Sequence, residues 1–357
     1  MKVSNLILQK LIGKGVFGEV YLSNYEGKNE LYATKIYDRI KIENSADLTR
    51  YFNNEIRFLH DLNHPNIVKF IEGKKTKKHF YIVTEYCNGG ELSEALEKYK
   101  LKYGKPFSEE IVQYLMKQII DAFNYLHSQG IIHRDIKLEN ILLQYETEED
   151  KKNLNIMKAI PKIIDFGLSI KPLNGEAKTI VGSPLNMAPI LLSKYTNPKI
   201  REAVYDYKVD IWSLGSICYE MLIGEFAFDS EDIDELVKKI EKGDYTVPLS
   251  LSEEAVSFLN AMLQYSPKNR LACAQLSKSR FLQQNINTFH KIQIDKFSDR
   301  IINDNELVIN IKTNNLFCSI FNKVYDNLIV GSNSKHINQK FDVEQNYVFS
   351  AGIFYKN

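Results

Sequence analysis

The octapeptide that decides the fold is His133-Arg134-Asp135-Ile136-Lys137-Leu138-Glu139-Asn140, which sets an acid, a base and a carboxamide at fixed spacing. In the preceding segment, 111–130, apolar residues recur at helical spacing up to Gly130, which predicts a helix that ends there. The run that follows, Ile141-Leu142-Leu143, is short and consists of branched apolar residues, which predicts a strand. The octapeptide is therefore a polar loop held at both ends by regular structure.

A charged loop is usually solvated surface, so the His-Arg-Asp triplet alone does not decide the function. The complete pattern is more specific, because Asn140 follows Asp135 at a matching distance and a second acidic motif, Asp165-Phe166-Gly167, lies downstream. This combination resembles the catalytic loop of the protein kinases. The resemblance implies that Asp135 accepts the proton of a substrate hydroxyl and that Asn140 holds a magnesium ion. Lys137 stands where Ser/Thr kinases carry a lysine that neutralises the transferring phosphoryl group, so the loop is similar to that of a Ser/Thr kinase.

The length and composition of the chain limit the remaining choices. A chain of 357 residues exceeds the usual size of a single core, which favours one bilobed unit plus an extension. Its formal net charge of +1 gives no reason to expect nucleic acid or an anionic membrane as the main partner. The four cysteines have no metal-ligand spacing, which fits reduced thiols in a cytoplasmic protein. No apolar run is long enough for a transmembrane segment, so we expect a soluble protein.

Glycines at positions 13, 15 and 18 have the spacing of a nucleotide-binding loop. A dinucleotide-binding fold is the obvious alternative, but it requires a helix directly after the glycines. Here the chain continues with strand-like segments, 20–22 and 32–36, so we favour a hairpin that covers phosphates. Glycines there let backbone amides approach phosphate oxygens without a Cβ in the way.

The resemblance extends to the rest of the nucleotide site. It implies that Lys35 contacts the α- and β-phosphates and that Glu55, on a helical run, is its ion partner. Without the resemblance, Lys35 would more often be a solvent-facing lysine and Glu55 an exposed helix acid. Asp165 would chelate magnesium together with Asn140. The residues expected to bind ATP are Ile12, Gly13, Gly15, Gly18, Val20, Ala33, Lys35, Glu85, Cys87 and Leu142.

The segment 168–189 resembles an activation loop. Thr179 lies where such kinases take an activating phosphate, from an upstream kinase or by autophosphorylation, and Arg134 would pair with that phosphate. Two residues depart from the family pattern: Asn186 stands in place of a tyrosine and Ile190 in place of a glutamate. In relatives that glutamate pairs with an arginine in the position of Arg270. Either another acid lies near Arg270, or the larger lobe is less stable than usual.

We expect an α+β fold with two lobes, an antiparallel β-rich N-terminal lobe with one main helix and a mostly helical C-terminal lobe. Residues 1–282 would form the kinase domain, with the lobes divided near residue 86, and Asp210 would bond the backbone near His133. Residues 283–357 form an extension to which the sequence assigns no chemistry, although its apolar runs suggest docking onto the catalytic lobe or a partner.

The resemblance implies transfer of the ATP γ-phosphoryl group to Ser or Thr hydroxyls of protein substrates, with ATP and Mg²⁺ as cofactors. Within the family, the segments 85–92 and 182–184 look like those of the autophagy-initiating Unc-51-like kinases, and calcium/calmodulin-dependent-type kinases share much of this pattern. The alternative is a pseudokinase scaffold that binds nucleotide without turnover. A scaffold of that kind would normally have lost Lys35, Asp135 or Asp165, and all three are present.

Overall fold

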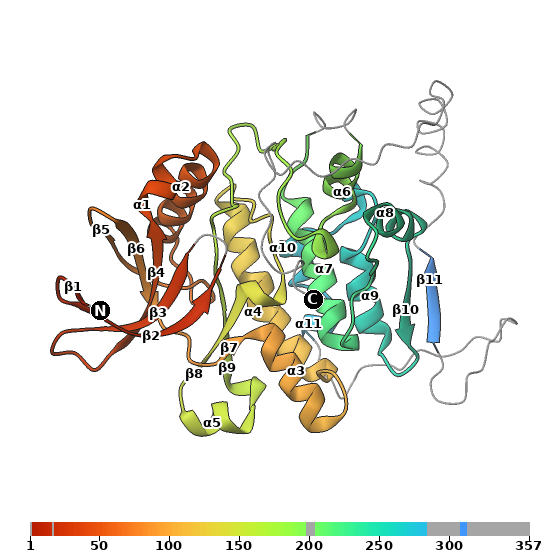
Figure 1. The fold of residues 1–357 in the computed structure, drawn as a ribbon. Coiled ribbons are helices and arrows are strands. Elements are labelled where there is room, and N and C mark those ends of the chain that lie inside the picture. The colour runs from red at the N-terminus through yellow and green to blue at the C-terminus, as the bar shows by residue number, and fades with distance from the viewer. Residues whose placement is uncertain (1, 16–17, 198–203, 284–307, 313–357) are drawn as a thin grey trace, which may run out of the picture.

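The computed structural model of the chain describes residues 2–15, 18–197, 204–283 and 308–312 (Figure 1). Most of the expected extension, residues 284–307 and 313–357, lies outside the described residues. Within the described ranges no helix is long and apolar enough to cross a membrane.

The N-terminal lobe is a six-stranded antiparallel sheet in the order β1-β2-β3-β4-β6-β5. Its strands are β1 (Lys2–Val3), β2 (Leu6–Lys14), β3 (Glu19–Tyr25), β4 (Leu31–Asp38), β5 (Phe70–Lys75) and β6 (His79–Glu85). The β2–β3 hairpin carries the glycine loop, as the sequence predicts. The expected main helix is α2 (Ala46–Asp61), which is capped by the Ser45 hydroxyl and preceded by a five-residue helix, α1 (Arg39–Glu43).

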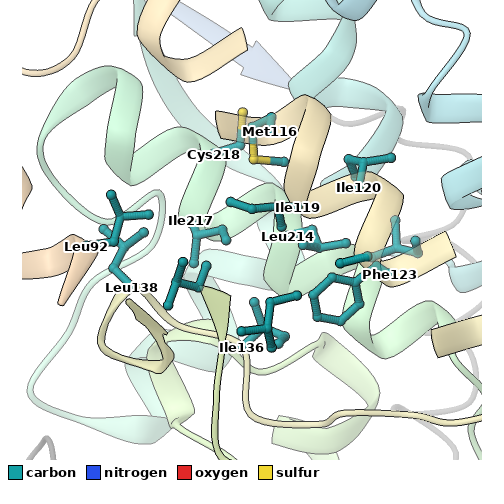
Figure 2. Packing of buried hydrophobic residues seen from close by; sticks show 14 of the residues in the cluster. Leu92, Met116, Ile119, Ile120, Phe123, Ile136, Leu138, Leu214, Ile217 and Cys218 are labelled. Atoms are coloured by element: carbon teal, nitrogen blue, oxygen red, sulfur yellow. The ribbon is translucent and has the colours of Figure 1, made fainter. Parts of the chain in front are cut away.

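The C-terminal lobe is mostly helical. Its elements are β7 (Gly90–Glu91), α3 (Leu92–Tyr103), α4 (Glu109–Ser128), β8 (Ile141–Tyr145), α5 (Glu148–Asn153), β9 (Ala159–Ile163), α6 (Pro189–Thr196), α7 (Lys208–Ile223), α8 (Ile233–Lys242), β10 (Asp244–Pro248), α9 (Glu253–Met262), α10 (Cys273–Leu276) and α11 (Arg280–Gln283). Helix α7 is buried around nearly its whole circumference, because it packs through the middle of the lobe. Figure 2 shows Ile119 and Phe123 of α4 packed with Leu214 and Ile217 of α7. The bilobed α+β architecture is the one predicted.

The polar loop is held at both ends by regular structure. The predicted helix is α4, capped by the Ser108 hydroxyl, and Gly130 follows it with a φ of 72°, a left-handed conformation that favours glycine. The predicted strand is β8, which pairs with both β7 and β9. Ile136 and Leu138, which lie within the loop, point into the core beside α7 (Figure 2). Burial of these two apolar side chains holds the backbone of the loop, which carries Asp135, Lys137 and Asn140. The predicted helix, loop and strand are confirmed.

Two surface features complete the larger lobe. The charged segment 146–152, which precedes β9, contains most of a short helix, α5, that has no buried residue and is capped by Thr147. From the extension, β11 (Val308–Lys312) pairs antiparallel with β10, with Ile309 opposite Val247 and Ile311 opposite Tyr245 (Figure 1). This segment of the extension therefore docks onto the catalytic lobe, one of the two arrangements expected for it.

Candidate active site

The polar loop is positioned from below by Asp210, a fully buried aspartate of α7. Its Oδ2 accepts the backbone amide of His133 at 2.9 Å, and its Oδ1 accepts that of Arg134 at 2.8 Å. The ring Nε2 of His127 lies 2.9 Å from Oδ2. Burial alone would raise the pKa of Asp210, but the hydrogen bond and charge of His127 outweigh it and the pKa is lowered. The expected role of Asp210 in holding the loop is confirmed.

Asp135 lies at the centre of the loop and is almost fully buried. The Asn140 side-chain amide donates to the Asp135 backbone carbonyl at 2.8 Å and to its Oδ2 at 3.0 Å. The hydroxyl of Ser183 donates to the other carboxylate oxygen, Oδ1, at 2.8 Å. The carboxylate thus already accepts a serine hydroxyl from the chain itself, at an ordinary O–H···O hydrogen-bond distance. Ser183 is not among the residues predicted for the site, although it belongs to the motif Gly182-Ser183-Pro184.

Lys35, Glu55 and Asp165 form a second charged group. Lys35 Nζ lies 2.9 Å from Glu55 Oε1 and 3.9 Å from Asp165 Oδ2, so β4, α2 and the segment after β9 meet there. Burial alone would lower the pKa of Lys35, but Asp165 and Glu55 outweigh it and raise the pKa, which keeps the ammonium charged. For Glu55, burial is the largest effect and raises the pKa, although the charge of Lys35 opposes it. The pKa of Asp165 is lowered because Lys35 and a hydrogen bond from Tyr51 outweigh its burial.

The expected ATP-binding residues come from both lobes. In the glycine loop the amide of Gly15 donates to the Gly18 carbonyl at 2.9 Å, and a Cβ on Gly18 would lie 2.2 Å from the Ile36 carbonyl oxygen, so only glycine is tolerated there. Val20 pairs with Lys35 in the β3–β4 ladder, and Ala33 pairs with Thr84 in the β4–β6 ladder. The remaining positions are exposed at Ile12, partly buried at Gly13, Glu85 and Leu142, and buried at Cys87.

The side chain of Glu85 ties the end of β6 to the other lobe. Its Oε1 accepts Lys162 Nζ of β9 and the backbone amide of Lys69, each at 2.8 Å. Lys162 itself is buried. The carboxylate of Glu85 therefore has a structural role in joining the two lobes.

Arg134 connects the polar loop to the expected activation segment. It has a φ of 73°, which is uncommon for a residue other than glycine. Its Nη1 donates to the Thr179 hydroxyl at 2.5 Å and to the Tyr205 hydroxyl at 3.1 Å, while its Nε donates to the Leu168 carbonyl at 2.7 Å. Thr179 is exposed, whereas Arg134 is buried beneath it. A phosphate on Thr179 would accordingly meet a guanidinium that is already in place.

The open question about Arg270 has a structural answer. Its guanidinium is fully buried and donates to three backbone carbonyls, those of Gln264 at 2.7 Å, Lys208 at 2.8 Å and Tyr265 at 3.0 Å. It also lies over the Trp212 ring, 5.1 Å from the centroid. Burial lowers the pKa of Arg270 to about 9, which leaves it charged at neutral pH. Carbonyl oxygens thus accept the hydrogen bonds of Arg270, and the charge of Asp206 opposes the effect of burial on its pKa, so another acid does lie near it.

Three comparisons with known proteins bear on this site. The model of the protein kinase domain family matches residues 6–282. Calcium-dependent protein kinase 5 of Plasmodium falciparum is 34% identical over 300 residues, which cover 81% of this chain and 48% of that protein. Serine/threonine-protein kinase atg1 of Dictyostelium discoideum is 32% identical over 296 residues, which cover 81% of this chain and 41% of that protein. The chain thus spans less than half the length of either relative.

Proposed function

The chain belongs to the protein kinase domain family, and on that basis we propose that it is a protein Ser/Thr kinase, which transfers the γ-phosphoryl group of ATP to Ser or Thr hydroxyls of protein substrates. The observation that carries the proposal is the hydrogen bond between the Ser183 hydroxyl and Asp135 Oδ1. A substrate hydroxyl that took the place of Ser183 would be oriented, and its proton accepted, by the same carboxylate. Phosphorylation of a peptide array in the presence of magnesium and ATP tests the activity directly.

The remaining residues of the site take roles of position and charge. Lys35, held by Glu55, would position the α- and β-phosphates, and Lys137 would neutralise charge on the transferring phosphoryl group. The kinase domain would span residues 1–282. The thiols of Cys87, Cys218 and Cys273 are free and buried, which fits a cytoplasmic location.

Magnesium and ATP fit the residues available. Asp165 offers a carboxylate and Asn140 an amide, and Mg²⁺ prefers such hard oxygen ligands. The β8–β9 pairing brings these two residues to the same end of the ribbon, since the amide of Ile164 donates to the Asn140 carbonyl at 3.0 Å. When bound, the ion would neutralise phosphate charge. Asp165 and Asn140 would hold it, while the glycine loop would cover the nucleotide.

The alternative function is that of a pseudokinase scaffold. Ile190 and Asn186 favour it, since both depart from the family pattern. Other contacts replace those that the two departures remove. The Asn186 amide donates to the Ser216 hydroxyl at 3.0 Å, and Arg270, which the glutamate missing at Ile190 would pair with, donates to backbone carbonyls. The paired Lys35 and Glu55 argue for turnover. The likeness to atg1 supports an Unc-51-like assignment. The likeness to calcium-dependent protein kinase 5 supports the calcium/calmodulin-dependent type instead.

We expect Thr179→Ala to lower kcat by about 10- to 100-fold, because the alanine variant cannot carry a phosphate that Arg134 would bind and so order the segment. The source of the phosphate would be an upstream kinase or the chain itself, and incubation of purified protein with ATP distinguishes the two. Turnover is measured with a peptide substrate, beside Thr179→Ser as the matched control that keeps the hydroxyl. Undiminished turnover of the alanine variant rules the regulatory role out.

Three acids, Glu139 in the polar loop and Glu91 and Glu220 outside it, are expected to favour substrates with basic residues before the acceptor. Glu139 acts electrostatically on both Glu91 and Glu220. Burial, followed by the charge of Glu139, raises the pKa of Glu220 to about 8, while Lys100 opposes the shift. Glu220 therefore gains its negative charge as the pH rises through about 8.

The pH dependence of KM tests this preference. For an arginine-containing peptide, KM should fall about fivefold between pH 6.5 and 8.5, and Glu220→Gln should remove most of that change. A peptide that carries citrulline in place of arginine is the control, since it lacks the charge. Equal pH profiles for the two peptides would contradict the proposed preference.

A further inference from the structure

Tyr51 of α2 contacts Asp165, the aspartate that is expected to chelate magnesium. None of the roles proposed above belongs to this tyrosine. Its hydroxyl donates to Asp165 Oδ1 at 2.5 Å, and Lys35 Nζ lies 3.4 Å from the same hydroxyl. The ring is almost fully buried.

Gly167 leaves the space that the Tyr51 ring occupies. A Cβ at Gly167 would lie 2.1 Å from two ring carbons of Tyr51, a distance that no side chain tolerates. The ring therefore packs directly on the backbone of the Asp165-Phe166-Gly167 turn. The glycine and the tyrosine together form a close contact between α2 and this turn.

The two carboxylate oxygens of Asp165 have different surroundings. Oδ1 accepts both the Tyr51 hydroxyl and the amide of Gly167, the latter at 3.2 Å. Oδ2 lies 3.9 Å from Lys35 Nζ, which is beyond hydrogen-bond distance, and the side chain remains 28% exposed. Asp165 also has a φ of 61°, an uncommon conformation that persists only where the surroundings hold it. The geometry thus leaves Oδ2 as the oxygen available to a cation.

We propose that Tyr51 is a positioning residue for the magnesium site, whose hydroxyl holds Oδ1 of Asp165 so that Oδ2 faces the ion. This inference rests on the proposed function. Hydrogen-bonded partners of a ligating carboxylate orient it, and their loss typically costs 10- to 100-fold in metal affinity. Without the Tyr51 hydroxyl, the carboxylate can turn toward Lys35, and the ion pair then competes with the metal. The contact also makes the metal site depend on the position of α2.

The test compares Tyr51→Phe with the unmodified chain. Phenylalanine keeps the ring against Gly167 and removes only the hydroxyl. Binding of a non-hydrolysable ATP analogue is measured by calorimetry at increasing magnesium concentrations and in the presence of a chelator. We expect equal binding with the chelator, and a half-maximal magnesium concentration that is about 10- to 100-fold higher in the variant.

Two controls separate this role from general weakening. Tyr245→Phe removes a tyrosine hydroxyl bond to Asn260 in the other lobe, and Asn54→Ala removes a contact of α2 with the Ser169 carbonyl. Both should keep the magnesium dependence of the unmodified chain, and melting curves without nucleotide check the folding of all variants. An unchanged or lower magnesium requirement in Tyr51→Phe, or the same shift in Asn54→Ala, overturns the inference. If the unmodified chain shows no magnesium-dependent binding, the proposed function fails and the inference fails with it.

Discussion

Asp135→Asn is expected to lower kcat for peptide phosphorylation by about 10³-fold, with ATP affinity nearly unchanged. Asparagine has the shape of aspartate but cannot accept a proton at neutral pH. Asn140 and Ser183 each donate to a different carboxylate oxygen of Asp135, so an asparagine amide would also leave one of these donors without its acceptor. Steady-state kinetics with magnesium and ATP give kcat, and calorimetry with an ATP analogue gives the affinity.

Asp121→Asn is the matched control, because this exposed aspartate of α4 lies 3.3 Å from His64 and has no place in the proposed site. It should retain full activity. The proposed role of Asp135 is wrong if Asp135→Asn turns over at a rate near that of the control. If neither the unmodified chain nor the control phosphorylates any peptide while both bind ATP, the scaffold alternative is preferred.

The sequence predicted the polar loop well because the residues that determine it are close in sequence. A capped helix, a glycine at its end and a branched strand are local signals, and they fixed the positions of Asp135 and Asn140. The pairing of Lys35 with Glu55 was also within reach, since a strand lysine and a helix acid at this spacing after a glycine loop form a known pattern.

Other contacts could not be predicted, because they depend on packing between distant segments. Tyr51 reaches Asp165 across 114 residues of sequence, and a tyrosine on an amphipathic helix reads only as a core residue. The acceptors of Arg270 are backbone carbonyls, which every residue carries and which therefore leave no signature in the sequence. The family pattern showed that a carboxylate is missing at Ile190, but not what replaces it.

Arg270→Met is expected to destabilise the chain by about 3–5 kcal/mol. Methionine fills much of the same space beside Trp212 but donates no hydrogen bond, so three buried carbonyl oxygens lose their donors. The free energy of unfolding is measured by urea denaturation, monitored through the fluorescence of Trp212, the single tryptophan of the chain. Arg270→Lys should recover only part of the lost stability. Its ammonium can donate to some of the carbonyls but cannot reproduce the planar fork of a guanidinium.

Arg280→Met supplies the comparison, since Arg280 is an exposed arginine on α11, and its replacement should change the free energy of unfolding by less than about 0.5 kcal/mol. The two Arg270 variants also show how the chain tolerates the absence of the glutamate at Ile190. If carbonyl oxygens satisfy Arg270, both methionine and lysine variants lose stability, and methionine loses more. If Arg270 is instead an uncompensated buried charge, removal of that charge relieves a desolvation penalty, and Arg270→Met becomes as stable as the unmodified chain or more so. That outcome would show that the larger lobe tolerates the departure at Ile190 at a cost rather than through substitute partners.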